Sequence, residues 1–273
     1  YPSFPPLLTA TLLQIPTMVH EQNAYLGRAN RILAIRTGHL ALSWQQTNNL
    51  PKDVTCFTGG MPVRQAFFNI KPNKLVPGGP LHLTIFGGSL GASIFAELLP
   101  PAIAALPANI RSRLRLTQQC RAEQLDALRA AYQKLRVAAT VEPFFDDIAD
   151  IMANSHLVIS RAGASSVAEL AAAGRAAILV PLPSAMDDHQ TANARQLANV
   201  GGGLYRAEAE LDAATLADDI TNLFGDEEKL AQMSQNARKL AMPDAAQAVA
   251  DYALALGDNK GRQPTHSISG GRS

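Results

Sequence analysis

The stretch from His156 to Gly174 most constrains the fold, because it has the pattern of a strand, a small-residue turn and a helix. Residues 156–160 form an apolar run of strand length. Gly163 lies in the turn and allows a ligand to approach the backbone closely. Residues 170–173 are strong helix formers, and Gly174 is a typical C-terminal stop. Such a strand–turn–helix unit is typical of a parallel α/β fold.

Glu169 in this helix admits two interpretations. The free N–H groups at the start of a helix attract an anion or a hydroxyl, and Glu169 can then accept hydrogen bonds from both hydroxyls of a ribose. Alternatively, Ser166 and Glu169 have the spacing of a capping box, in which the carboxylate only satisfies a backbone N–H. The motif by itself favours capping, so the ribose interpretation needs support from the rest of the chain.

Composition limits the class of protein. The chain has 273 residues, 47% of them hydrophobic and 17% charged, which suits a globular protein with two domains. A formal net charge of +1 and the lack of a Lys/Arg run do not indicate a nucleic-acid partner. Cys56 and Cys120 stand far apart, as free thiols do, and the histidines lack metal-binding spacing. No apolar run approaches the ~18 residues of a membrane span.

Strand-like and helical segments alternate along the whole chain, which predicts parallel α/β sheets. The expected strands are 16–20, 40–44, 55–58, 81–86, 113–118, 137–141, 156–160 and 176–181. The expected helices include 7–13, 27–35, 93–99, 122–135, 213–223, 226–241 and 244–256, with another between Asp188 and Gly201. Polar loops follow strands in both halves. We therefore expect two Rossmann-like domains with a cleft between them.

The region 69–80 is the expected domain boundary, because three prolines and two glycines suit a linker. We place the N-terminal domain at 1–78 and the C-terminal domain at 79–256, with its last helix packing back on the N-terminal domain. Residues 257–273 are glycine-rich and polar without periodicity, which predicts a disordered tail.

Three further stretches carry candidate ligand-binding groups. Arg64 follows a glycine turn and can bind a diphosphate bidentately or remain a surface charge. The turn 87–92 between a strand and a helix suits a phosphate, to which Ser89 adds a hydroxyl, although tight packing also explains its glycines. Its spacing is neither that of a dinucleotide fold nor that of a P-loop. After another strand, Asp146 suits a helix N-cap, and Phe145 suits core packing or stacking near a base.

Six stretches, in this order and spacing, resemble the MurG family of N-acetylglucosaminyltransferases. They are 20–23, 60–64, 87–92, 144–147, 161–174 and 188–194. The resemblance implies a GT-B fold and transfer of GlcNAc from UDP-GlcNAc to lipid I, which gives lipid II for peptidoglycan synthesis. It also implies inversion at the anomeric carbon without a metal or cofactor. The expected place is the cytoplasmic face of the bacterial inner membrane, at the membrane surface and near other cell-wall synthesis proteins.

The resemblance also implies roles for individual residues. Glu169 would hold the ribose hydroxyls, and Phe145 matches a position whose backbone meets uracil. The loop and helix start beside the nucleotide would be Ala164, Ser165, Ser166, Val167 and Ala168. The remaining donor contacts would be Arg64 and Ser89 at the phosphates and sugar, Gln190 at GlcNAc, and Asn23. His20 and Glu21 would lie near the acceptor as candidate catalytic residues.

The sequence departs from the family pattern at its start. Family members begin with a glycine-rich loop containing a histidine that is proposed as the general base, and no such loop occurs here. The segment from Tyr1 matches a region well inside the N-terminal domain. We therefore expect the N-terminal domain to be incomplete, with about the first third of a full-length chain missing.

Three alternatives remain open at this point. They are another UDP-sugar enzyme of GT-B fold, a catalytically inactive UDP-sugar binding module, and an NAD-dependent oxidoreductase. The oxidoreductase is disfavoured because neither glycine turn has the dinucleotide spacing.

Overall fold

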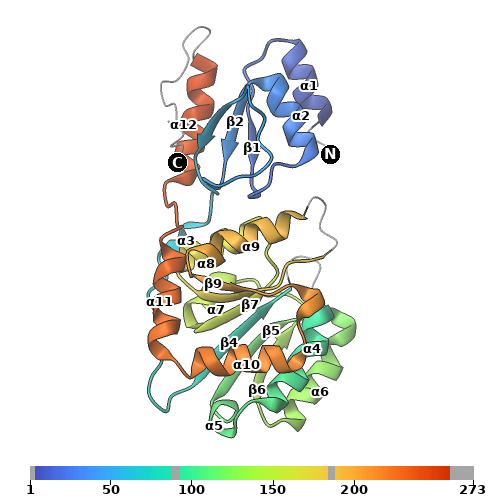
Figure 1. Cartoon of the computed structure of the whole chain (residues 1–273), viewed down its shortest axis with the longest axis vertical. Coiled ribbons are helices and arrows are strands. Elements are labelled where there is room, and N and C mark those ends of the chain that lie inside the picture. The colour runs from blue at the N-terminus through green and yellow to red at the C-terminus, as the bar shows by residue number, and fades with distance from the viewer. Residues whose placement is uncertain (1–3, 88–92, 184–187, 259–273) are drawn as a thin grey trace. The chain divides into compact units, whose positions relative to one another are not determined.

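The computed structural model describes residues 4–87, 93–183 and 188–258, which form two compact units (Figure 1). The first unit comprises Tyr1–Pro62 together with Met242–Ser273, and the second comprises Val63–Ala241. Each unit is built on a parallel sheet with helices, so the expected α/β class is confirmed. No described helix has the length and hydropathy needed to cross a membrane.

The second unit is organised around a 6-stranded parallel sheet with the order β6-β5-β4-β7-β8-β9. The strands are β4 Leu81–Phe86, β5 Leu114–Gln119, β6 Ala138–Glu142, β7 Leu157–Ser160, β8 Ala176–Leu179 and β9 Gly203–Tyr205. Counted from β4, this is the 3-2-1-4-5-6 order of a Rossmann fold. The direction of winding reverses between β4 and β7, where Phe86 pairs with Ser160 at the carboxyl ends. Strand β9 was not predicted, because its glycines were interpreted only as a helix stop.

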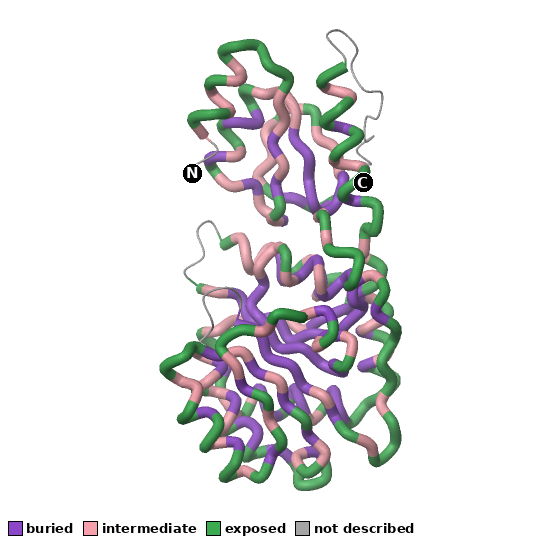
Figure 2. Tube along the Cα trace, turned by 180° about the vertical axis from the view of Figure 1, so that it is seen from behind, coloured by how far each residue is buried: buried purple, intermediate pink, exposed green. Residues whose placement is uncertain are grey.

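Helices cover both faces of this sheet. They are α3 Gln65–Phe68, α4 Ser93–Ala105, α5 Ala108–Arg111, η1 Ala122–Gln124, α6 Leu125–Lys134, α7 Ile148–Asn154, α8 Ala164–Ala173, α9 His189–Asn199, η3 Glu208–Glu210, α10 Ala213–Phe224 and α11 Glu227–Arg238. Every residue of β7 and β8 is buried, and Figure 2 shows buried residues gathered along these strands. This two-sided burial explains why the strands read as continuous apolar runs rather than alternating ones.

The first unit contains a 3-stranded parallel sheet in the order β1-β2-β3. Its elements are α1 Phe4–Leu12, β1 Val19–Glu21, α2 Arg28–Thr37, β2 His39–Leu42, β3 Thr55–Thr58 and α12 Ala245–Asp258. Helix α12 joins this unit through Tyr252, whose ring stacks on Phe57 with centroids 4.8 Å apart. The Tyr252 hydroxyl also lies 3.0 Å from Nδ1 of His39. The last helix therefore packs on the N-terminal strands.

The boundary between the units lies at Pro62, which corrects the prediction near Pro77–Pro80. Two arginines of the second unit hold the segment 68–71. Arg175 donates from Nη2 to the Lys71 carbonyl at 2.9 Å, and Arg238 donates to the carbonyls of Phe68 and Ile70. The proline and glycine content of 69–80 suggested a free linker, but these hydrogen bonds attach its first residues to the second unit. The boundary at 256 is likewise corrected to Ala241, because α12 belongs to the first unit.

Gly174 ends α8 in the left-handed conformation, with φ 59° and ψ 52°, as its C-cap. Gly174→Ala is expected to lower the free energy of unfolding by about 1–2 kcal/mol, because a Cβ is disfavoured in this region. The added carbon would also lie 3.1 Å from Cδ of Arg238. Urea unfolding measures the effect. Gly257→Ala is the control, since its Cβ would meet nothing within 4 Å. Equal stability of the two variants would contradict the prediction.

Candidate functional site

A pocket of about 450 Å³ opens in the second unit at the carboxyl ends of β4, β5, β6 and β7. Open parallel sheets bind ligands at this edge, where the direction of winding reverses. The lining residues are Arg64, Phe86, Gln119, Pro143, Phe144, Phe145, Asp146, Ile148, Met152, Ser160, Ser166, Glu169 and Leu170. The pocket thus brings together four of the predicted site residues: Arg64, Phe145, Ser166 and Glu169.

Glu169 provides the pocket with a carboxylate that accepts no hydrogen bond from the described residues. Burial raises its pKa above the ordinary value for glutamate, and the nearby Arg64 guanidinium opposes this shift. Arg64 itself lies over the ring of Phe67, 5.1 Å from the centroid. A half-buried acid without a hydrogen-bond donor has the capacity to accept two hydrogen bonds from a ligand.

The capping interpretation of Glu169 is wrong. Helix α8 begins at Ala164, and its N-cap is Gly163 in an extended conformation without a side-chain cap. Ser166 therefore lies inside the first turn, and Glu169 lies nearly a turn further along the helix. A capping box needs its glutamate at the third helical position, so this carboxylate cannot serve the helix start.

The start of α8 faces the pocket with little side-chain bulk. Ser165 is exposed, Ala164 and Ser166 are half-buried, and Val167 and Ala168 are buried. Of these five residues, Ser166 lines the pocket. Gly163 offers no capping side chain, so among the described residues no side-chain cap occupies the first N–H groups of the helix, which can serve a ligand.

The loop after β6 forms another wall of the pocket. The Phe145 ring meets the ring of Phe86 edge-on, with centroids 6.4 Å apart, while Phe144 is 69% exposed. The N-cap of α7 is Asp147, whose Oδ1 accepts the N–H of Asp150 at 3.1 Å. The prediction of Asp146 as the cap is therefore wrong, and Asp146 instead lines the pocket.

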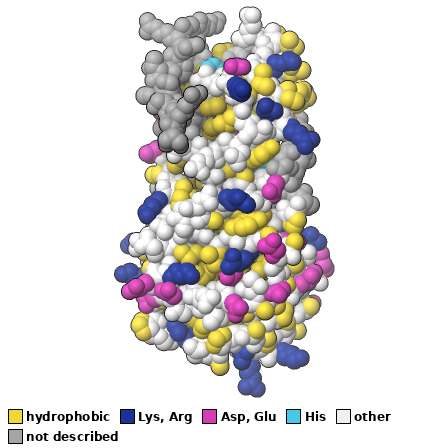
Figure 3. All heavy atoms as spheres, in the orientation of Figure 1, with side chains coloured by type: hydrophobic (Ala, Val, Ile, Leu, Met, Phe, Trp, Pro, Cys, Tyr) yellow, Lys and Arg dark blue, Asp and Glu magenta, His cyan; other side chains and the backbone are white. Residues whose placement is uncertain are grey.

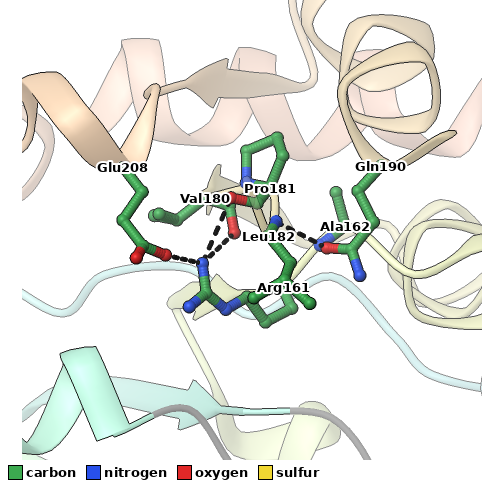
Figure 4. Close-up of polar contacts among 7 residues, drawn as sticks. All are labelled: Arg161, Ala162, Val180, Pro181, Leu182, Gln190 and Glu208. Atoms are coloured by element: carbon green, nitrogen blue, oxygen red, sulfur yellow. Dashed lines mark hydrogen bonds and ion pairs between the residues drawn. The ribbon is translucent and has the colours of Figure 1, made fainter. Parts of the chain in front are cut away.

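Gln190 joins the segments that follow β7 and β8. Its Oε1 accepts the N–H of Ala162 at 3.2 Å and the N–H of Leu182 at 3.0 Å, as Figure 4 shows. The Nε2 group of the same amide donates to none of the residues that the structure describes. Ser89, with the rest of the predicted phosphate turn at 88–92, lies outside the described residues.

The predicted residues His20, Glu21 and Asn23 belong to the first unit. Glu21 is 2% exposed, and its carboxylate accepts hydrogen bonds from Asn23, Gly27 and Asn30. Both oxygens are thus occupied in holding the loop before α2. The structure corrects the prediction of Glu21 as a catalytic group, because a buried carboxylate with these partners is not available to a substrate.

His20 remains the other catalytic candidate. Its Nε2 lies 3.1 Å from the carbonyl of Gly60 and 3.1 Å from the hydroxyl of Ser43. Burial lowers its pKa below the ordinary value for histidine, so the ring is neutral at pH 7. A neutral imidazole can accept a proton, which is the property that the predicted role requires.

Sequence reasoning missed Gln119, which lines the pocket from the end of β5. The polar pair Gln118-Gln119 at the end of this strand was the available signal. Arg115, an exposed residue near the start of the same strand, was also not singled out. On the face of the molecule in Figure 3, basic and acidic side chains are interspersed, in line with the small net charge.

Comparisons with known proteins agree with this architecture. Residues 82–249 match the Glycosyltransferase family 28 C-terminal domain. A transferase of Granulibacter bethesdensis is 46% identical over 256 residues, covering 92% of this chain and 67% of its own length. It is named UDP-N-acetylglucosamine–N-acetylmuramyl-(pentapeptide) pyrophosphoryl-undecaprenol N-acetylglucosamine transferase. A protein of the same name from Rhodospirillum rubrum is 45% identical over 263 residues, which make up 95% of this chain and 68% of that protein.

Solved structures show the same similarity. The crystal structure of Acinetobacter baumannii MurG matches with a TM-score of 0.76 and 35% sequence identity. The match covers 93% of this chain and 71% of the MurG chain. A glycosyltransferase of kitacinnamycin has a TM-score of 0.62 at 15% identity, with coverage of 92% and 74%. At that identity the second similarity concerns the fold alone.

The chain has two parallel α/β units, and one of them has the Rossmann strand order and a pocket with an acidic side chain at its switch point. With the similarity to a solved MurG structure, these features define a nucleotide-dependent glycosyltransferase of the GT-B class. The relatives narrow the assignment further. The chain belongs to glycosyltransferase family 28 and, within it, to the MurG family of N-acetylglucosamine transferases.

Proposed function

We propose that this protein transfers GlcNAc from UDP-GlcNAc to lipid I and so makes lipid II for peptidoglycan synthesis. The observation that carries the proposal is the Glu169 carboxylate, which accepts no hydrogen bond from the described residues and lies in a pocket at the switch point of a Rossmann-ordered sheet. The named activity of relatives at 45–46% identity supports the choice of donor and acceptor.

The donor nucleotide occupies the pocket beside α8. Glu169 accepts hydrogen bonds from the two ribose hydroxyls, and the loop at Phe145 meets the uracil through its backbone. The helix start from Ala164 to Ala168 lies beside the nucleotide. Arg64 offers a guanidinium to the diphosphate, for which its fork of donors is suited. Gln190 presents its Nε2, which donates to none of the described residues, to the GlcNAc.

In the reaction, the bond between the anomeric carbon and UDP is replaced by a bond to the acceptor oxygen. The acceptor hydroxyl attacks this carbon and loses its proton to a base, while the bond to UDP breaks and its electron pair leaves with the diphosphate. Arg64 and donors at helix starts stabilise the charge that develops on the departing UDP. His20, neutral at pH 7, is the proposed residue near the acceptor, with Asn23 towards the donor.

We further propose that the enzyme works peripherally on the cytoplasmic face of the inner membrane. The chemistry supports this placement, because lipid I is anchored in the bilayer while its sugar donor is water-soluble. An association with other cell-wall synthesis proteins belongs to the same proposal.

Calorimetric titration of the chain with UDP-GlcNAc tests the donor assignment, with UDP and ADP as comparison ligands. We expect saturable binding of UDP-GlcNAc and UDP, and at least tenfold weaker binding of ADP, since a uracil site rejects a purine. Equal binding of ADP and UDP would contradict the assignment. Incorporation of labelled GlcNAc into a lipid I analogue then tests transfer, and binding without incorporation would favour a binding module.

A further inference from the structure

Arg161 is a buried cation at the end of β7, only 8% exposed. Its Nη1 donates to the carbonyls of Val180 and Pro181, each at 3.1 Å, and forms an ion pair with Glu208 (Figure 4). The guanidinium also lies over the ring of Phe95, 5.4 Å from its centroid. Arg161 therefore links the end of β7 to the segment after β8 by hydrogen bonds, and the Glu208 carboxylate balances the charge of its guanidinium.

The same two segments hold Gln190. The residue after Arg161 is Ala162, and the residue after Pro181 is Leu182; their N–H groups are the two that bind Oε1 of Gln190. Figure 4 shows both sets of contacts next to each other. The orientation of the Gln190 amide therefore depends on the separation between β7 and the 180–182 segment. The backbone hydrogen bond from the Val180 N–H to the Ser160 carbonyl, at 2.9 Å, holds the start of that segment, and the contacts of Arg161 hold the Val180 and Pro181 carbonyls.

Glu208 stands outside the residues that line the nucleotide pocket. It belongs to η3, after β9, and neither Glu208 nor Arg161 lines the 450 Å³ pocket. Without the carboxylate, the guanidinium would remain buried and uncompensated, which strongly favours its movement towards water. That movement would release the carbonyls of Val180 and Pro181.

We propose that Glu208, acting through Arg161, is a positioning residue for recognition of the donor sugar. It holds residues 180–182 where Leu182 and Ala162 fix Oε1 of Gln190, so that Nε2 of this amide faces the sugar. The proposal rests on the proposed function for the identity of the sugar. It assigns Glu208 no contact with the nucleotide, so the sugar and UDP parts of the donor respond differently to its loss.

Glu208→Gln in the full chain tests this inference, with Glu210→Gln as the matched control. Glu210 lies on the same short helix but is exposed. In Glu208→Gln we expect the affinity for UDP-GlcNAc to fall about tenfold, the value of one lost hydrogen bond. The affinity for UDP is expected to change less than about twofold, because the nucleotide pocket is intact. Glu210→Gln should change neither.

Hydrogen exchange of the ligand-free variants provides a second readout that does not depend on the identity of the donor. Peptides covering Ala162 and Leu182 should exchange faster in Glu208→Gln than in the parent or in Glu210→Gln. Unchanged exchange in a folded Glu208→Gln would overturn the positioning role. An equal loss of UDP and UDP-GlcNAc affinity would also overturn it, since the effect would then be on the whole fold. A parent chain that binds no UDP-GlcNAc would instead contradict the proposed function, while exchange would still decide the positioning role.

Discussion

Glu169→Ala is expected to weaken the binding of both UDP-GlcNAc and UDP by about one hundredfold. Two hydrogen bonds from ribose hydroxyls to a carboxylate are lost, and hydrogen bonds to charged groups contribute more than neutral ones. Because the ribose is common to both ligands, their affinities should fall together. Calorimetry on the two ligands measures the effect. Glu228→Gln on α11 removes an exposed acid outside the pocket and should change neither affinity.

Removal of the Glu169 charge should weaken ligand binding, but it should not lower the stability of the fold. Burial raises the pKa of Glu169, so the folded protein binds a proton more tightly than the unfolded chain does. This group therefore favours the fold below its unfolded pKa and loses that contribution as pH rises through its folded pKa. At pH 7, Glu169→Gln should melt at the same or a higher temperature than the parent while binding nucleotide poorly. A lower melting temperature, or unimpaired binding, would contradict the role of Glu169 as a ligand carboxylate.

Arg175→Ala is expected to lower the free energy of unfolding by about 4 kcal/mol or more. Arg175 is 1% exposed, and its guanidinium donates to the carbonyls of Met152, Ala153, Ala173, Gly174 and Lys71. These include carbonyls at the ends of α7 and α8, which have no partner within their own helix. Burial, with a contribution from Arg238, lowers the pKa of Arg175 to about 10, and the residue remains charged at pH 7.

One further variant separates the effect of the hydrogen bonds of Arg175 from the effect of its side-chain volume, and a second variant is the control. Arg175→Met keeps much of the apolar stem but none of the donors, so it should remain clearly less stable than the parent in urea unfolding. Arg115→Ala, at an exposed arginine of β5, should change stability by less than about 0.5 kcal/mol. If Arg175→Met matched the parent, the buried carbonyls would not need the guanidinium.

Local sequence pattern was sufficient for much of the fold. The strands at 55–58 and 81–86 have their predicted bounds, because apolar runs between turn residues depend on nearby sequence alone. The stop at Gly174 was predictable for the same reason, since a left-handed C-cap is a property of that one residue. The site residues Arg64, Phe145, Ser166 and Glu169 could be singled out because each lies in a turn, loop or helix that follows a strand in a parallel α/β pattern, and because their stretches resemble the MurG family.

Only the tertiary structure decided which partner each polar group has. The spacing of Ser166 and Glu169 favoured a capping box, yet the helix begins at Ala164 and leaves the carboxylate to the pocket. The glycine- and proline-rich segment after Asn69 suggested a linker, yet Arg175 binds Lys71 across the fold. Residue spacing predicts helices, strands and turns, because these depend on residues that are neighbours in the sequence. Hydrogen bonds between residues far apart in the chain, such as these, form only once the sheet has brought their elements together.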